Sequence, residues 1–443
     1  MSIVTTYNKS AWLGNYPKHW KLRRIKNIFS EVEDKSTTGN EDLLSVSHYT
    51  GVTLKRDSLE NEDDFISNAE SLEGYKKVAQ GDLVINIMLA WNGSLGISPY
   101  NGITSPAYCV YRAKENNNPD YFGYLFATNL LKTEFRKKST GIIDSRLRLY
   151  SDKFFSIFSI VPPLTEQNQI VEFIKIQSQK INHFIAKKKQ FIALLKEQRQ
   201  SVINEAVTKG INKKVKLKDS GIKWLGNIPE HWEIRRLRYC GQCQNGLNKG
   251  GEFFGSGYPF YGYGDIYNNE ILPIEPSGLV MSSVEDRENC SVQEGDVFFT
   301  RTSEIVDEIA IASTCFETIE DATFSGFLIR FRPFKDILEK SFSSYYFRCQ
   351  LLRAYFVKEM NIITRASMSQ DLLKNLPILI PPKKEQIEIY QHIKTETATI
   401  ETAIAKTLKE IELIREYKEA MIAEAVMGKI NFSKNKLVKY GRE

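Results

Sequence analysis

The chain has 443 residues, of which 42% are hydrophobic and 26% are charged, an ordinary composition for a soluble globular protein. No apolar run approaches the roughly 18 residues of a membrane helix, and no basic segment leading into an apolar stretch marks the first residues for export. We therefore expect a cytoplasmic protein with two or three folding units. The formal net charge of +6 permits nucleic-acid binding without establishing it.

One short segment occurs twice in the chain. The sequence Trp-Leu-Gly-Asn at 12–15, with a His-Trp pair at 19–20, returns at 224–227 with a His-Trp pair at 231–232. These two segments hold four of the five tryptophans of the protein, so chance does not explain the match. The repeat predicts that the chain consists of two related halves.

A second repeated segment begins at Pro162-Pro163 and again at Pro381-Pro382, and it continues without a gap to the Glu-Ala-Val sequences that end at Val207 and Val426. Between the repeated segments the halves keep only fragments, such as Gly-Asp at 81–82 and 295–296. Constant ends with divergent middles indicate a shared scaffold that carries different specificities.

Each pair of prolines is followed by roughly 45 residues without Gly or Pro that are rich in Glu, Gln, Lys, Ile and Ala, which predicts a long helix. Gly210 and Gly428 follow these segments and are typical of helix ends. At about 1.5 Å per residue each helix is roughly 65 Å long, too long to be buried in a small domain.

Both long helices carry an apolar stripe at matching positions, found by stepping along the sequence in fours and threes. The polar breaks in the stripe recur every eleven residues, which favours a nearly straight or slightly right-handed pair over a strict left-handed coiled coil. The expected helix-pair interface consists of Ile170, Ile174, Ile181, Ile185, Ile192, Leu195, Val202, Ile389, Ile393, Ile400, Ile404, Ile411, Ile414 and Met421.

Charge also favours pairing of the two helices. Residues 165–210 contain eight Lys and Arg against four Asp and Glu, whereas residues 384–429 contain seven against nine. A two-fold relation between the halves predicts an antiparallel pair with a globular module at either end. The alternative, in which each helix packs only on its own module, leaves most of a long apolar stripe uncovered.

The parts between the repeated segments combine short strands, turns and helical stretches, which predicts an α+β fold. Strand-like runs at 82–87 and 296–300 each follow a glycine. Helical stretches are expected near 121–138 and 341–359.

Aromatic residues, small polar residues and arginines are interleaved in loop-like sequence in both modules. Arginine binds guanine edges, asparagine binds adenine, and aromatic rings contact thymine methyl groups or stack on an extruded base. Taken one at a time, such residues more often simply pack in the fold. The candidates for DNA contact are Trp91, Asn92, Arg146, Arg148, Tyr261, Tyr263, Arg301, Thr302, Ser303 and Arg365.

Two segments superficially resemble parts of an enzyme. Residues 252–257 contain an acidic residue and a Gly-x-Gly, as a methyl-donor site does, but they run into Tyr258-Pro259 instead of opening a helix. Residues 105–108 lack the second proline of the amino-methyltransferase tetrapeptide, and no phosphate-binding loop of an ATP motor occurs. We therefore predict no catalytic residue in this chain.

The six cysteines are scattered, which is typical of free thiols in a reducing compartment. Cys240 and Cys243 have the spacing of a redox pair or of half a zinc site. Their counterparts in the first half are Ile28 and Glu31, and no second cysteine pair exists. The sequence therefore predicts neither a redox centre nor a metal site.

The duplicated Trp-Leu-Gly openings, Pro-Pro helix starts with Glu-Gln, and Glu-Ala-Val helix ends resemble the specificity subunit of type I restriction-modification systems over the whole chain. The resemblance implies two target-recognition domains, each reading one half of a bipartite DNA site, and a long antiparallel pair of conserved helices that separates them and sets the spacer. It implies that two methylation subunits, which bring S-adenosylmethionine, dock on the helices and openings, and that restriction subunits join through them. The scaffold and docking candidates are Trp12, Gly14, Pro17, Trp20, Trp224, Gly226, Pro229 and Trp232.

The resemblance also gives the expected domains. They are target-recognition domain 1 (1–160), the first spacer helix (161–210), target-recognition domain 2 (211–380), the second spacer helix (381–430) and a C-terminal tail (431–443). Family members often carry an arginine after Gly-Asp and a strand, as Arg301 does, but the first module has residues 87–90 without one. Its base-contacting residues are therefore expected elsewhere, at Trp91, Asn92 or Arg146.

Two other functions remain as hypotheses. One is an enzyme that fuses a methyltransferase with a nuclease, which the missing motifs oppose. The other is a structural adaptor without DNA contact, for which DNA binding by the assembled complex is absent or insensitive to salt.

Overall fold

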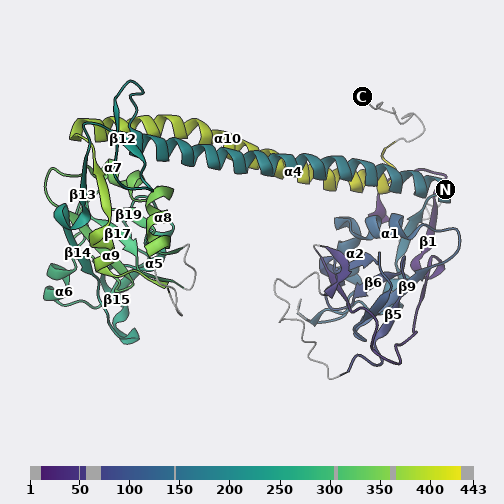
Figure 1. The fold of residues 1–443 in the computed structure, drawn as a ribbon. Coiled ribbons are helices and arrows are strands. Elements are labelled where there is room, and N and C mark those ends of the chain that lie inside the picture. Colours follow the sequence, from purple (N-terminus) through teal and green to yellow (C-terminus); the bar gives the residue numbers. More distant parts are fainter. Residues whose placement is uncertain are drawn as a thin grey trace, which may run out of the picture. The chain divides into compact units, whose positions relative to one another are not determined.

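A computed structural model describes residues 11–48, 50–55, 71–143, 146–303, 308–359 and 366–430 (Figure 1). The chain divides into two compact units. Unit 1 comprises Met1–Lys187 and Lys409–Glu443, and unit 2 comprises Lys188–Leu408. Each unit consists of a module of strands and short helices together with part of each of two long helices, so the predicted α+β class is confirmed.

The module of unit 1 is built on a four-stranded antiparallel sheet in the order β2-β9-β6-β7. Strand β10 pairs with β1, near the start of the module. The elements are β1 (Lys21–Arg24), β2 (Phe29–Glu31), β3 (Leu44–Ser47), β4 (Gly51–Leu54), β5 (Lys76–Val78), β6 (Leu83–Asn86), β7 (Leu95–Ile97), β8 (Gly102–Thr104), β9 (Tyr108–Ala113), α1 (Pro119–Phe126), α2 (Asn129–Lys138), α3 (Ser151–Ser156) and β10 (Phe158–Val161).

The module of unit 2 repeats this plan with the sheet order β14-β21-β17-β19, and its last strand β23 pairs with β13. The elements are β11 (Leu217–Asp219), β12 (Asn227–Pro229), β13 (Glu233–Arg236), β14 (Gly241–Asn245), β15 (Phe254–Tyr261), α5 (Tyr263–Tyr267), β16 (Gly278–Val280), α6 (Val284–Asn289), β17 (Val297–Thr300), β18 (Thr302–Ser303), β19 (Ala312–Thr314), β20 (Thr323–Phe324), β21 (Leu328–Pro333), α7 (Lys340–Tyr346), α8 (Gln350–Glu359), β22 (Ala366–Ser367), α9 (Gln370–Asn375) and β23 (Pro377–Ile380). The internal repeat is therefore a repeat of structure.

The helical stretch expected after the sheet is divided into two helices in each module. In unit 1, α1 ends at Phe126, and the Thr128 side chain caps the start of α2 by accepting the Leu131 N–H. Helices therefore lie where they were expected, and in unit 1 they are separate because a capping threonine competes with helix continuation. In unit 2, α7 and α8 are divided in the same way.

A buried aspartate follows a left-handed glycine at the start of each central strand. Gly81 and Gly295 have φ angles of 92° and 88°. The carboxylate of Asp82 accepts two hydrogen bonds of 2.8 Å from Arg112. Asp296 accepts bonds of 2.7 and 2.6 Å from Arg332 in the same way. In both halves, the Gly-Asp fragment thus places an aspartate at the start of the central strand, where it pairs with an arginine.

The two long helices are α4 (Leu164–Lys209), with 46 residues, and α10 (Lys383–Val426), with 44. Gly210 and Gly428 follow them at positive φ, as the sequence predicts. In unit 1, Lys418 donates to Asn182 at 3.0 Å. In unit 2, Arg199 lies 3.1 Å from Glu401. Because residue numbers rise along α4 as they fall along α10, the helices are antiparallel.

All fourteen residues of the expected helix-pair interface are buried or half-buried. The half-buried ones are Ile185, Val202, Ile404 and Ile414. Some members of the stripe also contact a module. Ile170 and Ile174 belong to the core of unit 1, and Ile389 and Ile393 belong to the core of unit 2. The apolar stripe therefore packs on a partner helix and, at the helix starts, on a module.

The end of one long helix and the start of the other share a core with each module. In unit 1, Ala425 and Val426 of α10 lie in the same cluster as Ile170 of α4, and the Tyr121 hydroxyl donates to the Val426 carbonyl at 2.9 Å. The alternative in which each helix packs only on its own module is therefore wrong.

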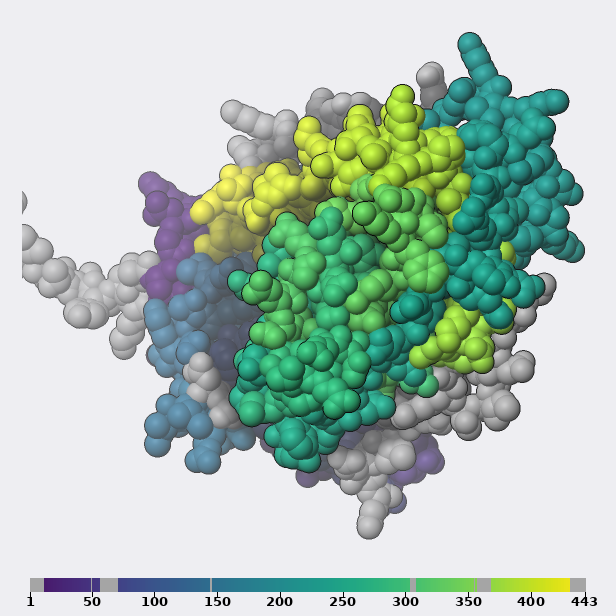
Figure 2. Space-filling model, turned by 90° about the vertical axis from the view of Figure 1, so that its left-hand side faces the viewer, coloured from purple at the N-terminus to yellow at the C-terminus, as the bar shows by residue number. Residues whose placement is uncertain are grey.

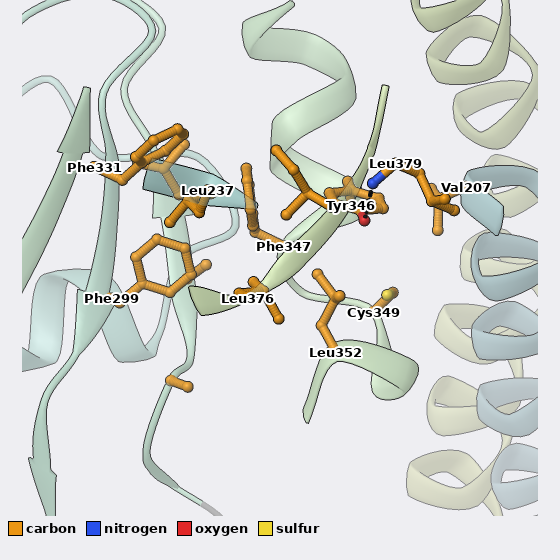
Figure 3. Packing of buried hydrophobic residues seen from close by; sticks show 14 of the residues in the cluster. Val207, Leu237, Phe299, Phe331, Tyr346, Phe347, Cys349, Leu352, Leu376 and Leu379 are labelled. Carbon is orange, nitrogen blue, oxygen red and sulfur yellow. Dashed lines mark hydrogen bonds between the residues drawn. The ribbon is translucent and has the colours of Figure 1, made fainter. Parts of the chain in front are cut away.

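Figure 3 shows the corresponding core of unit 2, where Val207 of α4 lies beside Leu379 of β23 and Tyr346 of α7. The fully buried Tyr346 hydroxyl accepts the Leu379 N–H at 2.7 Å, so its polar atom is satisfied inside the core. Figure 2 shows one face of unit 2, on which teal residues from the region of α4 and β11–β12 border yellow-green residues of α10.

The repeated His-Trp pair binds the glutamate in the first turn of a long helix. Glu166 accepts the Trp20 indole N–H at 2.8 Å and lies 2.7 Å from the His19 ring. In the other half, the same contacts join Glu385 to Trp232 at 3.0 Å and to His231 at 2.8 Å. Each histidine therefore helps to hold a long helix on its module.

The glutamine that follows this glutamate is also an anchor. Gln167 is fully buried, its amide donates to the Pro162 carbonyl at 2.8 Å, and its Oε1 accepts the Asn118 N–H at 2.7 Å. Gln386 makes the matching contacts with Pro381 and Glu339. The repeated Glu-Gln therefore fixes each helix start on its module.

Replacing Glu385 by alanine should lower the thermal unfolding midpoint, because the buried Trp232 indole N–H loses a charged acceptor. A hydrogen bond to a charged group contributes about 1.5–3 kcal/mol. Differential scanning calorimetry of the full chain measures the effect. Glu388→Ala, which removes an exposed glutamate of the same helix, is the control. Equal midpoints for the two variants would contradict the anchoring role.

Candidate nucleic-acid interface

In both modules, the segment after the central strand is held beside the segment that precedes the last short helix. In unit 1, the Leu149 N–H donates to the Ile87 carbonyl at 2.9 Å. In unit 2, the Met368 N–H donates to the Arg301 carbonyl at 2.8 Å, and β18 pairs with β22. Candidate residues that are far apart in the sequence are therefore brought together in the fold.

Trp91 lies in a short 3₁₀ helix (Ala90–Asn92) that packs against α2. Its indole N–H donates to the Met88 carbonyl at 3.1 Å, which fixes the ring. The guanidinium of Arg136 stands over this ring, 5.2 Å from its centroid. Asn92 is exposed beside them. This arrangement places an amide and a guanidinium within one small surface region.

Basic residues of module 1 lie on α2, which packs against the 3₁₀ helix of the tryptophan, and on the segment after it. The basic residues in the last turn of α2 also stabilise that helix, since the helix dipole favours cations at its C-terminal end. The exposed Arg146 extends the surface, and an antiparallel bridge joins Thr140 to Arg148. Two exposed apolar side chains, Leu89 and Ile142, lie close in sequence to Trp91 and to Arg146. The basic surface of module 1 comprises Lys132, Arg136, Lys137, Lys138, Arg146 and Arg148.

In module 2, Arg301 directly follows the central strand β17. Its N–H donates to the Phe327 carbonyl at 2.9 Å and its Nη1 to the Gly326 carbonyl at 3.4 Å. The Nε atom is buried and has no hydrogen-bond partner within the described ranges. Thr302 is half-buried in β18. Arg301 thus has a donor atom that the described residues leave unsatisfied.

Tyr261, Ser303 and Arg365 are three further candidates for DNA contact in module 2, and the structure describes the side chain of the first. Tyr261 is fully buried, and its hydroxyl donates to the Pro273 carbonyl at 2.6 Å. Burial raises the pKa of this hydroxyl. The proposed DNA contact at Tyr261 is therefore contradicted, because core packing uses both its ring and its hydroxyl. Arg365 lies outside the described residues, as does the side chain of Ser303.

Tyr263 is half-buried, and its ring stacks on that of Tyr267 with centroids 5.9 Å apart. Its hydroxyl donates to the Glu308 carbonyl at 3.0 Å. These contacts tie α5 to the chain just after β18. Tyr263 therefore positions this region of module 2.

The residues of the repeated openings serve the scaffold in different ways. Trp20 and Trp232 are buried, whereas Trp12 and Trp224 are half-buried. Trp224 packs on Tyr355, with ring centroids 5.7 Å apart. Four smaller residues shape the turns: Gly14 and Gly226 have positive φ, and the Pro17 and Pro229 carbonyls accept the N–H of the tryptophans that follow.

Each unit has a groove along the end of one long helix. In unit 1, a cavity of about 930 Å³ lies between Trp12–Asn15, the start of α2 and the end of α10. In unit 2, a cavity of about 790 Å³ lies between the end of α4 and the start of α8. The matching elements make these grooves counterparts in the repeat.

Sequence reasoning missed several residues that the structure brings into these regions. Arg136 and Lys132 lie on a predicted helix, and only the fold places them at Trp91 and Gly93. The pairing of Asp82 with Arg112 had a usable signal, since Arg332 stands at the corresponding place after Asp296.

The cysteine pair lies in ordinary structure. Cys240 is buried, and its Sγ contacts the Arg236 carbonyl at 3.7 Å. Cys243 is half-buried in β14, and burial raises the pKa of its thiol to about 11. Burial also raises the pKa of Cys315 to about 12. Protonated thiols are poor nucleophiles and poor metal ligands.

Cys243 and Cys315 should react slowly with iodoacetamide at pH 8, since a thiol with a pKa near 11 is ionised to about one part in a thousand there. Intact-mass spectrometry with peptide mapping follows the reaction, and the chain unfolded in guanidinium gives the reference rate. Native labelling as fast as in the unfolded chain would overturn this expectation.

This architecture, two copies of an α+β module with divergent loops and a shared pair of long helices, defines a bivalent recognition protein. The family model described as the type I restriction modification DNA specificity domain matches the chain twice, at residues 17–197 and 229–413. The chain belongs to this family.

Curated relatives are specificity subunits. The type I restriction enzyme MjaVIII specificity subunit of Methanocaldococcus jannaschii is 23% identical, and the match covers 94% of this chain and 93% of that one. The EcoKI specificity subunit of Escherichia coli is 21% identical, with 80% of this chain and 76% of that one covered.

Solved structures share the fold. A chain from a structural study of complex assembly and conformational transition of the type I R-M system superposes with a TM-score of 0.68 at 14% identity, covering 94% of this chain and 100% of that one. The HsdS subunit from Thermoanaerobacter tengcongensis gives a TM-score of 0.53 at 15% identity, covering 94% and 98%. In the part of the chain that the structure describes, no helix combines the length and apolarity needed to span a membrane.

Proposed function

We propose that this chain is the sequence-specific DNA-recognition subunit of a type I restriction-modification complex. Each module reads one half of a bipartite DNA site, and the complex methylates adenine or restricts DNA through its partner subunits. The observation that carries the proposal is the duplicated specificity domain, in which equivalent scaffolds hold different loops beside their central strands.

In module 1, the basic surface holds the phosphate backbone while Trp91 and Asn92 contact bases. Arg136 supports this division of roles, because it is fixed over the Trp91 ring at the edge of the surface. Phosphate contacts give affinity and orientation, whereas contacts with base edges give specificity. Arg146 and Arg148 contribute from the paired segment.

In module 2, Arg301 is the principal base-contacting residue. A guanidinium can donate two hydrogen bonds to the O6 and N7 atoms of guanine. Among the described residues, the Arg301 Nε has no partner and its Nη1 makes a long bond of 3.4 Å to the Gly326 carbonyl, which supports this role. Thr302 and Ser303 follow in β18, and Arg365 immediately precedes β22, the strand that pairs with β18.

The chain acts without catalytic residues or a bound cofactor of its own, and S-adenosylmethionine is held by the methylation subunits. Two equivalent grooves, one in each unit, support docking of two such subunits, with Trp12 and Gly14 lining the groove of unit 1. Restriction subunits join through the methyltransferase complex. The long helices set the number of base pairs between the half-sites.

Deleting the gene should abolish one split methylation motif in the cell, because the partner subunits lose the protein that directs them to it. Single-molecule sequencing of modified bases in strains with and without the gene gives the motif. Complementation by the intact gene should restore it. An unchanged set of modified motifs would sink the proposal, whereas an S-adenosylmethionine-binding isolated chain would favour a fused enzyme.

Arg301→Ala should relax recognition at one base pair of the half-site that module 2 reads, since each bidentate contact contributes about 1–3 kcal/mol of discrimination. Asn92→Ala is the matched variant in module 1, because Asn92 is the residue proposed to contact a base there, and it should affect only the other half-site. Methylation mapping of both strains compares the two motifs. A change in both half-sites from either single substitution would contradict the assignment of one module to each half-site.

A further inference from the structure

A large aromatic side chain is exposed at the turn beside Arg301. Phe327 is 61% exposed, although its neighbours Gly326 and Leu328 are buried. The turn joins β20 to β21, and the Phe327 carbonyl accepts the Arg301 N–H at 2.9 Å. Single exposed aromatic residues are common on protein surfaces, so a function for Phe327 must follow from its position.

The sheet places Phe327 and Arg301 on the same side. Thr300 of β17 pairs with Leu328 of β21, and both residues are fully buried. The bond from Arg301 to Phe327 continues this antiparallel pairing by one residue. Because side chains alternate between the faces of a sheet and paired residues share a face, the next pair lies on the side away from the core.

Hydrogen bonds fix the backbone of this turn. The Ser325 Oγ accepts the Phe327 N–H at 3.2 Å, and the Ser325 carbonyl accepts the Leu328 N–H at 2.9 Å. The Gly326 N–H donates to the Leu247 carbonyl at 2.7 Å. An aromatic side chain has only two rotatable bonds, so a ring on a fixed backbone loses little conformational entropy when a ligand contacts it.

Module 1 has the same turn with a different exposed residue. Residues 105–108, which lack the second proline of the amino-methyltransferase tetrapeptide, form this turn between β8 and β9. The Ser105 Oγ accepts the Ala107 N–H at 3.3 Å, and the Ser105 carbonyl accepts the Tyr108 N–H at 2.9 Å. Ala107 is exposed at the place that corresponds to Phe327. One backbone turn thus presents an alanine in one module and a phenylalanine in the other.

We propose that Phe327 contacts the C5-methyl group of a thymine in the half-site of module 2, at a base pair beside the one that Arg301 contacts. This inference rests on the proposed DNA-reading function. The thymine methyl group lies in the major groove, where phenylalanine and alanine make apolar contacts with it and arginine binds guanine. Residues paired across two strands have Cβ atoms about 4.5–5.5 Å apart, close enough to serve neighbouring base pairs stacked about 3.4 Å apart.

The test uses the full chain assembled with its methylation subunits, and duplexes in which each thymine of the half-site of module 2 is replaced in turn by deoxyuridine. This replacement removes one methyl group and leaves the base pairing unchanged. One of these duplexes should bind the unaltered complex about fourfold more weakly, the factor for burial of one methyl-sized group. Fluorescence anisotropy titrations at constant salt measure the affinities.

Phe327→Ala should bind the thymine duplex and this deoxyuridine duplex equally, because the ring that contacts the methyl group is absent. Phe334→Ala is the matched control and should keep the fourfold difference. Phe334 is 46% exposed and directly follows β21, the strand that Phe327 directly precedes.

A fourfold difference that persists in Phe327→Ala would overturn the contact, because another residue then senses the methyl group. The contact is also overturned if no deoxyuridine duplex binds the unaltered complex more weakly, even where Phe327→Ala weakens binding by stacking or sugar contacts that it removes. Absence of sequence-specific binding by the unaltered complex would instead contradict the proposed function.

Thermal unfolding midpoints check the folding of each variant. Phe327→Ser places a small polar side chain at the same exposed position and should also bind the two duplexes equally. It gives the result if Phe327→Ala does not assemble with the methylation subunits.

Discussion

Burial of the helix ends in the module cores is the constraint on which the rest of the structure depends. A module contributes a sheet and short helices, but its core is completed by the start of one long helix and the end of the other. Ile170 and Val426 share the core of unit 1, and Val207 and Ile389 share the core of unit 2. Since these contacts are apolar and fully buried, each module is bound to both helices.

The polar anchors at the helix starts explain why the two ends of each repeat unit are nearly constant while the middles differ. Glu166 and Gln167 satisfy an indole N–H, a backbone N–H and the polar groups beside the prolines. Few other residue pairs offer that combination of charge, reach and donor capacity. The loops after the central strands are not required to make these contacts, so their residues can differ. Trp91 and Arg301 both follow a central strand, but one side chain is aromatic and the other is a cation.

Under the proposed function, the two modules present different DNA-contacting residues on the same scaffold. Module 1 has the exposed Arg136 over Trp91, whereas module 2 has the half-buried, partly satisfied Arg301. The first arrangement suits a screened contact with the backbone, because exposed cations are mobile and hydrated. The second suits a single fixed contact, because buried donors need a defined acceptor.

Sequence periodicity by itself determined the repeat, the two long helices and their apolar faces, because a 3.6-residue period and matched Gly and Pro positions are local properties. The resemblance to the family, in turn, suggested Arg301 from its place after Gly-Asp and a strand. Only the tertiary structure decided that Tyr261 is a core residue and that Arg136 stands over Trp91. Those outcomes depend on which segments meet across the fold, and burial and hydrogen-bond satisfaction are set by such long-range contacts.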